Sequence, residues 1–149
     1  MKKSLFTLLL IFNFFCLSAQ ENTSILKEEK EEYSFIDLEE IPIFPGCEEI
    51  EKKERIKCFQ TKISEHIVSN LNYPEEARNN KIQGRVSVRL IINKEGNIDK
   101  IATKGPLNGI LLEKEARRII SLLPKMTPGI QNGKPADVLY SIPISFKLN

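Results

Sequence analysis

The chain has 149 residues, of which 41% are hydrophobic and 28% are charged. This length allows one domain of ordinary size, and eight Phe and three Tyr exclude a wholly disordered chain. The net charge of +2 conceals a polarised chain. Residues 21–60 carry twelve acidic and six basic residues, whereas residues 61–149 carry eight acidic and fourteen basic residues. An acidic segment therefore precedes a basic one.

The N-terminus has the pattern of a secretory signal peptide. Two lysines precede an apolar run over residues 4–17, and small residues that suit cleavage follow it. The run is shorter than the roughly 20 apolar residues that a membrane span needs. We therefore expect residues 1–20 to be a cleaved signal peptide and the mature protein to be exported. Retention as an inner-membrane anchor through residues 4–19 is the alternative.

Residues 21–50 are predicted to be an acidic, mostly flexible lead-in, because charges outnumber their scattered apolar residues. The folded domain is then expected over residues 51–149, with its core at 62–148. Cys47 and Cys58 are the two cysteines left after signal-peptide removal. In an exported chain this even pair favours a disulfide, and two free thiols are the alternative.

The first predicted helix covers residues 52–71. Apolar side chains recur there every four residues, which is the spacing of an amphipathic helix that faces a core. They are Phe59, Ile63, Ile67 and Leu71. Tyr73 precedes Pro74 and therefore ends this helix, and Pro74 can begin a second, short helix over 74–80.

The middle of the domain is predicted to be a hairpin followed by a helix. A strand begins at Gly84, and residues 86–92 alternate between buried and exposed types. Residues 93–97 form the loop, in which Gly96 suits a positive φ. The returning strand over 97–104 spaces Ile98 and Ile101 three apart, which indicates a bulge. An apolar stripe then predicts a helix over 109–123, which Pro124 ends.

The end of the chain is predicted to be a turn-rich stretch followed by a long strand. Residues 127–135 are rich in Pro, Gly and Asn, and residues 136–148 have the longest period-two alternation in the chain. The order of elements predicts an α+β fold, in which a three-stranded antiparallel sheet packs against two helices.

Chemistry-bearing motifs are missing from this sequence. It contains no nucleophile elbow, phosphate loop or zinc-protease motif, and its one histidine, His66, lacks the further ligands a metal site needs. We therefore predict no catalytic residues, no metal and no cofactor. The scattered basic residues and core-facing aromatics also argue against nucleic-acid binding. A secreted hydrolase with an unrecognised site is the enzyme alternative.

The last strand is the candidate binding element, because a small sheet has exposed edges that are either protected or used to capture another strand. Pro143 cannot donate a hydrogen bond, so its side of the strand is expected to be the free edge. Pro143 either blocks aggregation or leaves one hydrogen bond missing beside a partner strand. The predicted protein-binding edge comprises Val138, Leu139, Tyr140, Ser141, Ile142, Pro143, Ile144, Ser145 and Phe146.

A set of short motifs runs in order through the second half of the chain. Its members are Tyr73, Pro74, Gly84, Gly96, Pro128, Gly129, Asn132 and Gly133, followed by the closing apolar strand. With these motifs, the chain from Tyr73 onward resembles the C-terminal domain of the TonB energy-transducer family. The segment between Cys47 and Cys58 resembles the lead-in of TonB-like proteins from the Bacteroidetes group.

The resemblance implies a periplasmic domain that binds a TonB box-like peptide of an outer-membrane transporter, by strand addition around residues 138–146. An inner-membrane energising complex and a second copy of the chain are further partners to be considered. Family members carry a Pro-rich linker that spans the periplasm, whereas residues 21–60 contain only Pro42 and Pro45. Two roles therefore remain open, a force-transducing module and a free exported module that binds without transducing energy.

Overall fold

The computed structural model describes residues 31–148. The predicted signal peptide, the alternative anchor and the first ten residues of the lead-in lie outside the described residues. Within residues 31–148, no helix is long and apolar enough to cross a membrane.

The fold is α+β, as predicted, but its sheet has five strands where the sequence predicted three. The three predicted strands are present as β2, β3 and β5, and two further strands, β1 and β4, pair with β5. Both were missed because three residues are too few to show a period-two pattern. The strands are β1 (Glu32–Ser34), β2 (Gly84–Ile92), β3 (Ile98–Lys104), β4 (Gly129–Gln131) and β5 (Lys134–Phe146).

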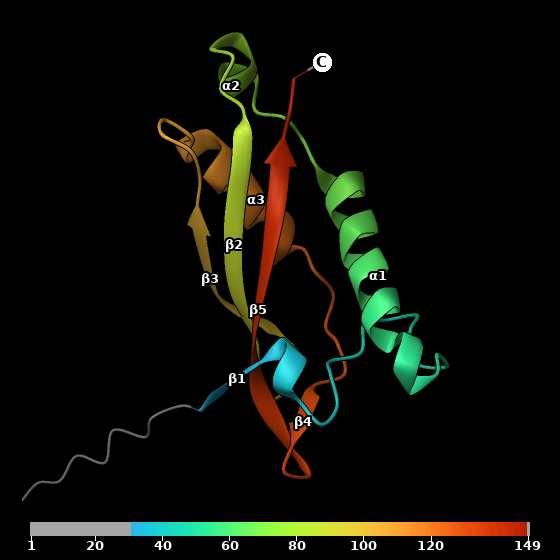
Figure 1. Ribbon diagram of the computed structural model, residues 1–149. Helices are drawn as coiled ribbons and strands as arrows, with labels where there is room; N and C mark the ends of the chain where they lie inside the picture. Colours follow the sequence, from blue (N-terminus) through green and yellow to red (C-terminus); the bar gives the residue numbers. More distant parts are fainter. Residues whose placement is uncertain (1–30, 149) are drawn as a thin grey trace, which may run out of the picture.

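The strand order is β1-β5-β2-β3, so β2 and the first part of β5 lie inside the sheet (Figure 1). β2 pairs antiparallel with β5 from Gly84 opposite Phe146 to Ile92 opposite Val138. Its pairing with β3 slips between Arg89 and Ile91. The predicted bulge in the returning strand is therefore confirmed, and Lys100 within it adopts a φ of 47°.

The predicted helices are confirmed as α1 (Arg55–Asn70), α2 (Glu75–Asn79) and α3 (Ile110–Ser121). A 3₁₀ turn over Lys52–Glu54 leads into α1, which explains its predicted start at residue 52. In Figure 1, α3 crosses behind β2, and α1 lies on the β5 side of the sheet.

The core lies between this sheet and the two long helices. The predicted helical spacing and strand alternation are confirmed, because the apolar residues of each stripe lie in one buried cluster or pack against it. The central members are Phe59, Ile63, Ile67, Val86, Val88, Leu90, Ile92, Leu112, Ala116, Ile119, Ile120, Val138, Ile144 and Phe146.

The second half of the lead-in also packs on the domain, although its composition predicted mostly flexible chain. The Phe35 ring lies 4.7 Å from the Phe59 ring of α1 and 4.9 Å from the Tyr140 ring of β5. The predicted disulfide joins Cys47 to Cys58, with their Cα atoms 6.0 Å apart. A few buried side chains and one covalent link thus attach a segment whose exposed charges suggested disorder.

Candidate protein-binding edge

The outer edge of β5 changes character at Tyr140. Before it, β1 pairs in parallel with β5, with Ser34 opposite Leu139 as the last pair. From Tyr140 to Phe146, β2 covers one edge of β5, and no strand of residues 31–148 covers the other. Of the nine residues predicted to form the binding edge, Val138 and Leu139 thus have strands on both sides, and seven have an open edge.

Pro143 lies in the middle of this open stretch, opposite Ser87 of β2. A proline is tolerated in a strand where its missing N–H would face away from the ladder. Pro143 therefore lies in the part of β5 whose outer edge is uncovered.

The side chains of the open stretch divide cleanly between the two faces of the sheet. Ile144 and Phe146 are buried on the helix side, and Tyr140 and Ile142 are half-buried there. Burial raises the pKa of the Tyr140 phenol above its ordinary value. The opposite face presents the exposed side chains of Ser141, Pro143 and Ser145. No residue of the open stretch carries a charge at neutral pH, so its edge presents backbone and small polar groups.

The motif residues that were singled out from the sequence gather at the two ends of β5. At the C-terminal end of β5, the Tyr73 hydroxyl donates to the Ile82 carbonyl at 2.5 Å, and the Tyr73 ring meets the Phe146 ring edge-on at 5.9 Å. Burial raises the pKa of the Tyr73 phenol. Pro74 immediately precedes α2, and Gly84 faces Phe146 across the ladder. These residues fix the end of β5.

Gly96 lies at the opposite end of the sheet, in the β2–β3 loop. Its φ is 82°, and a Cβ there would lie 1.8 Å from the Met126 carbonyl oxygen. The close approach serves a hydrogen bond, because the Met126 N–H donates to the Gly96 carbonyl at 2.9 Å. Glycine is therefore required where the hairpin meets the stretch leading to β4.

The β4–β5 hairpin contains the remaining motif residues. Pro128 precedes β4, and Gly129 at its start faces Ala136, where a Cβ would lie 2.8 Å from a Val138 methyl group. Asn132 and Gly133 form a two-residue loop and both have positive φ, as in a type I′ turn. This hairpin sets the position at which β5 enters the sheet.

Sequence reasoning missed one buried polar cluster, which holds the α1–α2 connection. Glu115 of α3 is 8% exposed and accepts hydrogen bonds from the Asn72 N–H and from the Arg118 guanidinium. The Arg118 guanidinium holds the pKa of the Glu115 carboxyl below its ordinary value, and the Asn72 N–H acts in the same direction. Arg118 also donates to the Asn70 carbonyl at 2.6 Å. No local pattern marks this cluster, because it joins residues 43 and 48 positions apart.

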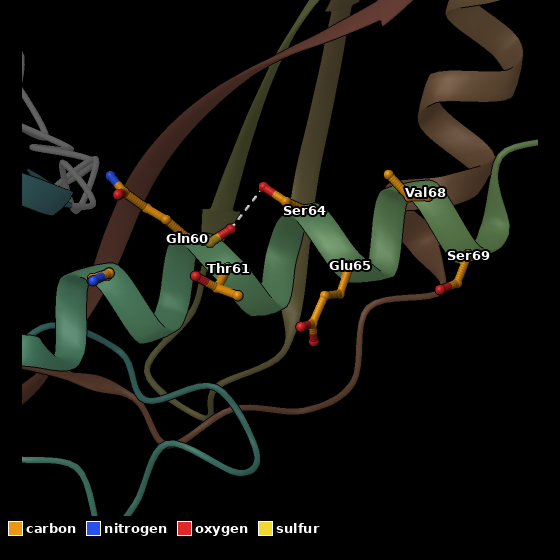
Figure 2. A pocket seen from close by; sticks show the side chains of 7 residues that line it. Gln60, Thr61, Ser64, Glu65, Val68 and Ser69 are labelled. Atoms are coloured by element: carbon orange, nitrogen blue, oxygen red, sulfur yellow. Dashed lines mark hydrogen bonds between the residues drawn. The ribbon is translucent and has the colours of Figure 1, made fainter.

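A shallow hollow on α1 does not form a site. Figure 2 shows that its lining side chains all come from α1, and the one hydrogen bond drawn runs from the Ser64 hydroxyl to the Gln60 carbonyl. No second element faces these side chains across the hollow. Within the described part of the chain, no group of three or more acidic, His or Cys residues is arranged to hold a metal ion.

The comparisons with known proteins identify the family. The family model for the Gram-negative bacterial TonB protein C-terminal domain matches residues 69–148, which is more than half of the chain. The chain therefore belongs to the TonB C-terminal domain family, as the motif resemblance predicted. The family implies a TonB-like role in coupling transport across the cell envelope.

The solved structures that are similar to this chain include two NMR solution structures of the Helicobacter pylori TonB C-terminal domain. The longer one is 25% identical, covers 68% of this chain and 87% of its own, and has a TM-score of 0.47. The shorter one is 28% identical, covers 60% of this chain and 92% of its own, and has a TM-score of 0.42. The comparison with curated proteins found no match.

Proposed function

We propose that this protein is a periplasmic TonB-like module that binds a segment of an outer-membrane transporter by β-strand addition to β5. The observation that carries the proposal is the open, uncharged edge from Tyr140 to Phe146. Backbone hydrogen bonds along such an edge supply affinity without a catalytic group or a cofactor. Binding, not catalysis, is then the activity of this site.

The chain's own strand β1 supports this mode of binding. β1 adds to the outer edge of β5 in parallel, from Glu32 opposite Asp137 to Ser34 opposite Leu139. Phe35 then turns away from the strand line and packs between α1 and Tyr140. A transporter segment would take up the edge where β1 leaves it, and would pair with the seven residues from Tyr140 onward.

Amide hydrogen exchange with and without a transporter's TonB box-like peptide tests this proposal. We expect exchange at residues 140–146 to slow on binding, while exchange in β3 stays unchanged. Unchanged exchange at 140–146 when the peptide binds would contradict strand addition.

A Ser141→Pro variant provides the matching mutational test. Ser141 has the same orientation in the strand as Pro143, so the substitution removes a second donor from the open edge and keeps the ladder to β2. We expect peptide affinity to fall about tenfold, since a backbone hydrogen bond is worth roughly 1 kcal/mol and proline also obstructs the approach. Ser141→Ala is the control and should bind like the native protein.

The proposed domain organisation is a signal peptide over 1–20, a lead-in over 21–50 and the TonB-like domain over 51–149. The disulfide between Cys47 and Cys58 supports export to an oxidising compartment. Intact mass with cell fractionation distinguishes the two possible roles. A soluble species that starts near residue 20 favours a free periplasmic module, whereas a membrane-bound species that retains residues 4–19 favours an anchored transducer.

A further inference from the structure

A basic hollow lies at the C-terminal end of β5, between the residues that follow β5 and those that precede β2. It is lined by Tyr73, Arg78, Lys81, Gln83, Lys147 and Leu148. Three of these six side chains are cations and none is an acid. Figure 1 shows α2 and the end of β5 at the same end of the sheet, which is where this hollow lies.

Fixed contacts hold the walls of the hollow. The Tyr73 ring is held by its hydroxyl bond to Ile82 and by the Phe146 ring, and the Arg78 guanidinium lies 5.9 Å from the Tyr73 ring centroid. The Leu148 N–H donates to the Gln83 side-chain oxygen at 3.2 Å, which joins the residues after β5 to those before β2. The cations are therefore displayed on a defined surface.

The three cations are available to an external acid. Neither Arg78 nor Lys81 nor Lys147 forms an ion pair with a carboxylate of residues 31–148. The nearest acids in sequence, Glu75 and Glu76 on α2, are exposed and do not line the hollow. Three cations around one hollow that no carboxylate of residues 31–148 pairs with attract a negatively charged group.

We propose that this hollow binds an acidic residue at the end of the peptide strand that adds to β5. The proposal rests on the proposed function and extends its site beyond Phe146. A strand paired with residues 140–146 covers about 20 Å at 3.3 Å per residue. Its next residue then lies beside Lys147, which directly follows β5. The positive charge of the hollow and its place at the end of β5 select a peptide carboxylate as the occupant.

Binding of a transporter's TonB box-like heptapeptide with blocked ends tests the proposal. Three forms are compared by calorimetry: two glutamates added at one end, two glutamates added at the other end, and two glutamines added at both ends. We expect one glutamate form to bind about three- to tenfold more tightly than the glutamine form, because exposed ion pairs contribute modestly and three cations are present. Raised salt should remove this preference. The end that gives the preference also reports whether the peptide runs parallel or antiparallel to β5.

Two triple variants with the same change in net charge make the test specific. Arg78→Gln, Lys81→Gln and Lys147→Gln together should abolish the preference and leave binding of the glutamine peptide unchanged. Lys57→Gln, Lys114→Gln and Lys125→Gln change exposed lysines elsewhere and should keep the preference. Lys147 lies outside the helices and strands, so its substitution should not disturb folding. The single variant Lys147→Gln should therefore weaken the preference even if the first triple variant folds poorly.

The outcomes separate this inference from the proposed function. If the glutamate and glutamine peptides bind equally, or if the first triple variant keeps the preference, the basic hollow is not a subsite, and strand addition stands. If no form of the peptide binds the native chain, strand addition at β5 is overturned together with this inference.

Discussion

β3 and the exposed part of β5 are outer strands of the same sheet, yet β3 has more of the features that exclude another strand. β3 has a bulge, a left-handed Lys100 and the charged residues Asp99 and Lys104. Each of these features discourages pairing with a further strand. Residues 140–146 of β5 are regularly paired with β2 and carry no charge. The contrast supports the proposal that a partner strand binds at the β5 edge.

Gly96→Ala is expected to have the largest effect. It disrupts the β2–β3 hairpin and with it the protected edge of β3. The new Cβ would clash with the Met126 backbone and occupy a positive φ, so the β2–β3 hairpin must distort. We expect the free energy of unfolding to fall by about 3 kcal/mol or more. Urea denaturation measures this change.

Gly133→Ala is the matched control for that substitution. Gly133 also has a positive φ, but a Cβ there meets no atom within 4 Å. A loss of about 1 kcal/mol is expected from the backbone conformation alone. Equal losses in the two variants would show that the Met126 contact is unimportant.

Phe35→Ala should lengthen the open edge of β5. Phe35 is 5% exposed and packs on Phe59 and Tyr140. Its loss leaves a cavity that should lower the free energy of unfolding by about 3 kcal/mol, and it should release β1 from β5. Amide exchange at residues 137–139 should then rise to the level of the open stretch. Ile36→Ala, at a neighbour that is 81% exposed, should change stability by less than about 0.5 kcal/mol. A β1 that stays paired in the Phe35 variant would contradict this account.

Glu115→Gln should loosen the end of the β5 edge and leave the β3 edge unchanged. The cluster fixes the chain that leads to Tyr73 and hence to Phe146. Loss of charge-assisted hydrogen bonds should cost about 2 kcal/mol at neutral pH. Exchange should rise near residue 146 and not in β3.

The same variant has a defined pH signature. The pKa of Glu115 is lowered from its ordinary 4.5 in the folded state, so its stabilisation is fully present above that value. The stabilisation is lost as pH falls through the lowered pKa, because the carboxyl then protonates. The native protein should therefore lose stability below about pH 4.5 more steeply than Glu115→Gln. Exposed Glu76→Gln should keep the native acid response.

Pro143→Ser is expected to have the smallest effect on stability and to change association. It restores one donor to the open edge, so copies of the chain can pair edge to edge more readily. We expect the association constant to rise about tenfold with the free energy of unfolding nearly unchanged. Analytical ultracentrifugation measures the monomer–dimer balance, with Pro135→Ser as the control in the stretch covered by β4. Unchanged association would show that Pro143 does not protect this edge.

Local sequence determined the three long strands, the helices and the bulge, because each depends on residues a few positions apart. The alternation in β5 predicted which face is buried, and Pro143 marked the part of the strand that has an open edge. The disulfide between Cys47 and Cys58 was predicted because they are an even pair of cysteines in a chain expected to be exported. These features follow from backbone geometry and from the spacing of apolar side chains.

Only the tertiary structure decided how much of the edge is open. β1 covers Leu139 because Phe35, which lies in a charged segment, packs between α1 and β5. The Glu115 cluster and the basic hollow likewise join residues that are far apart in sequence. Such contacts have no local pattern, since their stability depends on which surfaces folding brings together. The sequence therefore predicted a candidate edge strand, and the packing of the rest of the chain set the limits of its open edge.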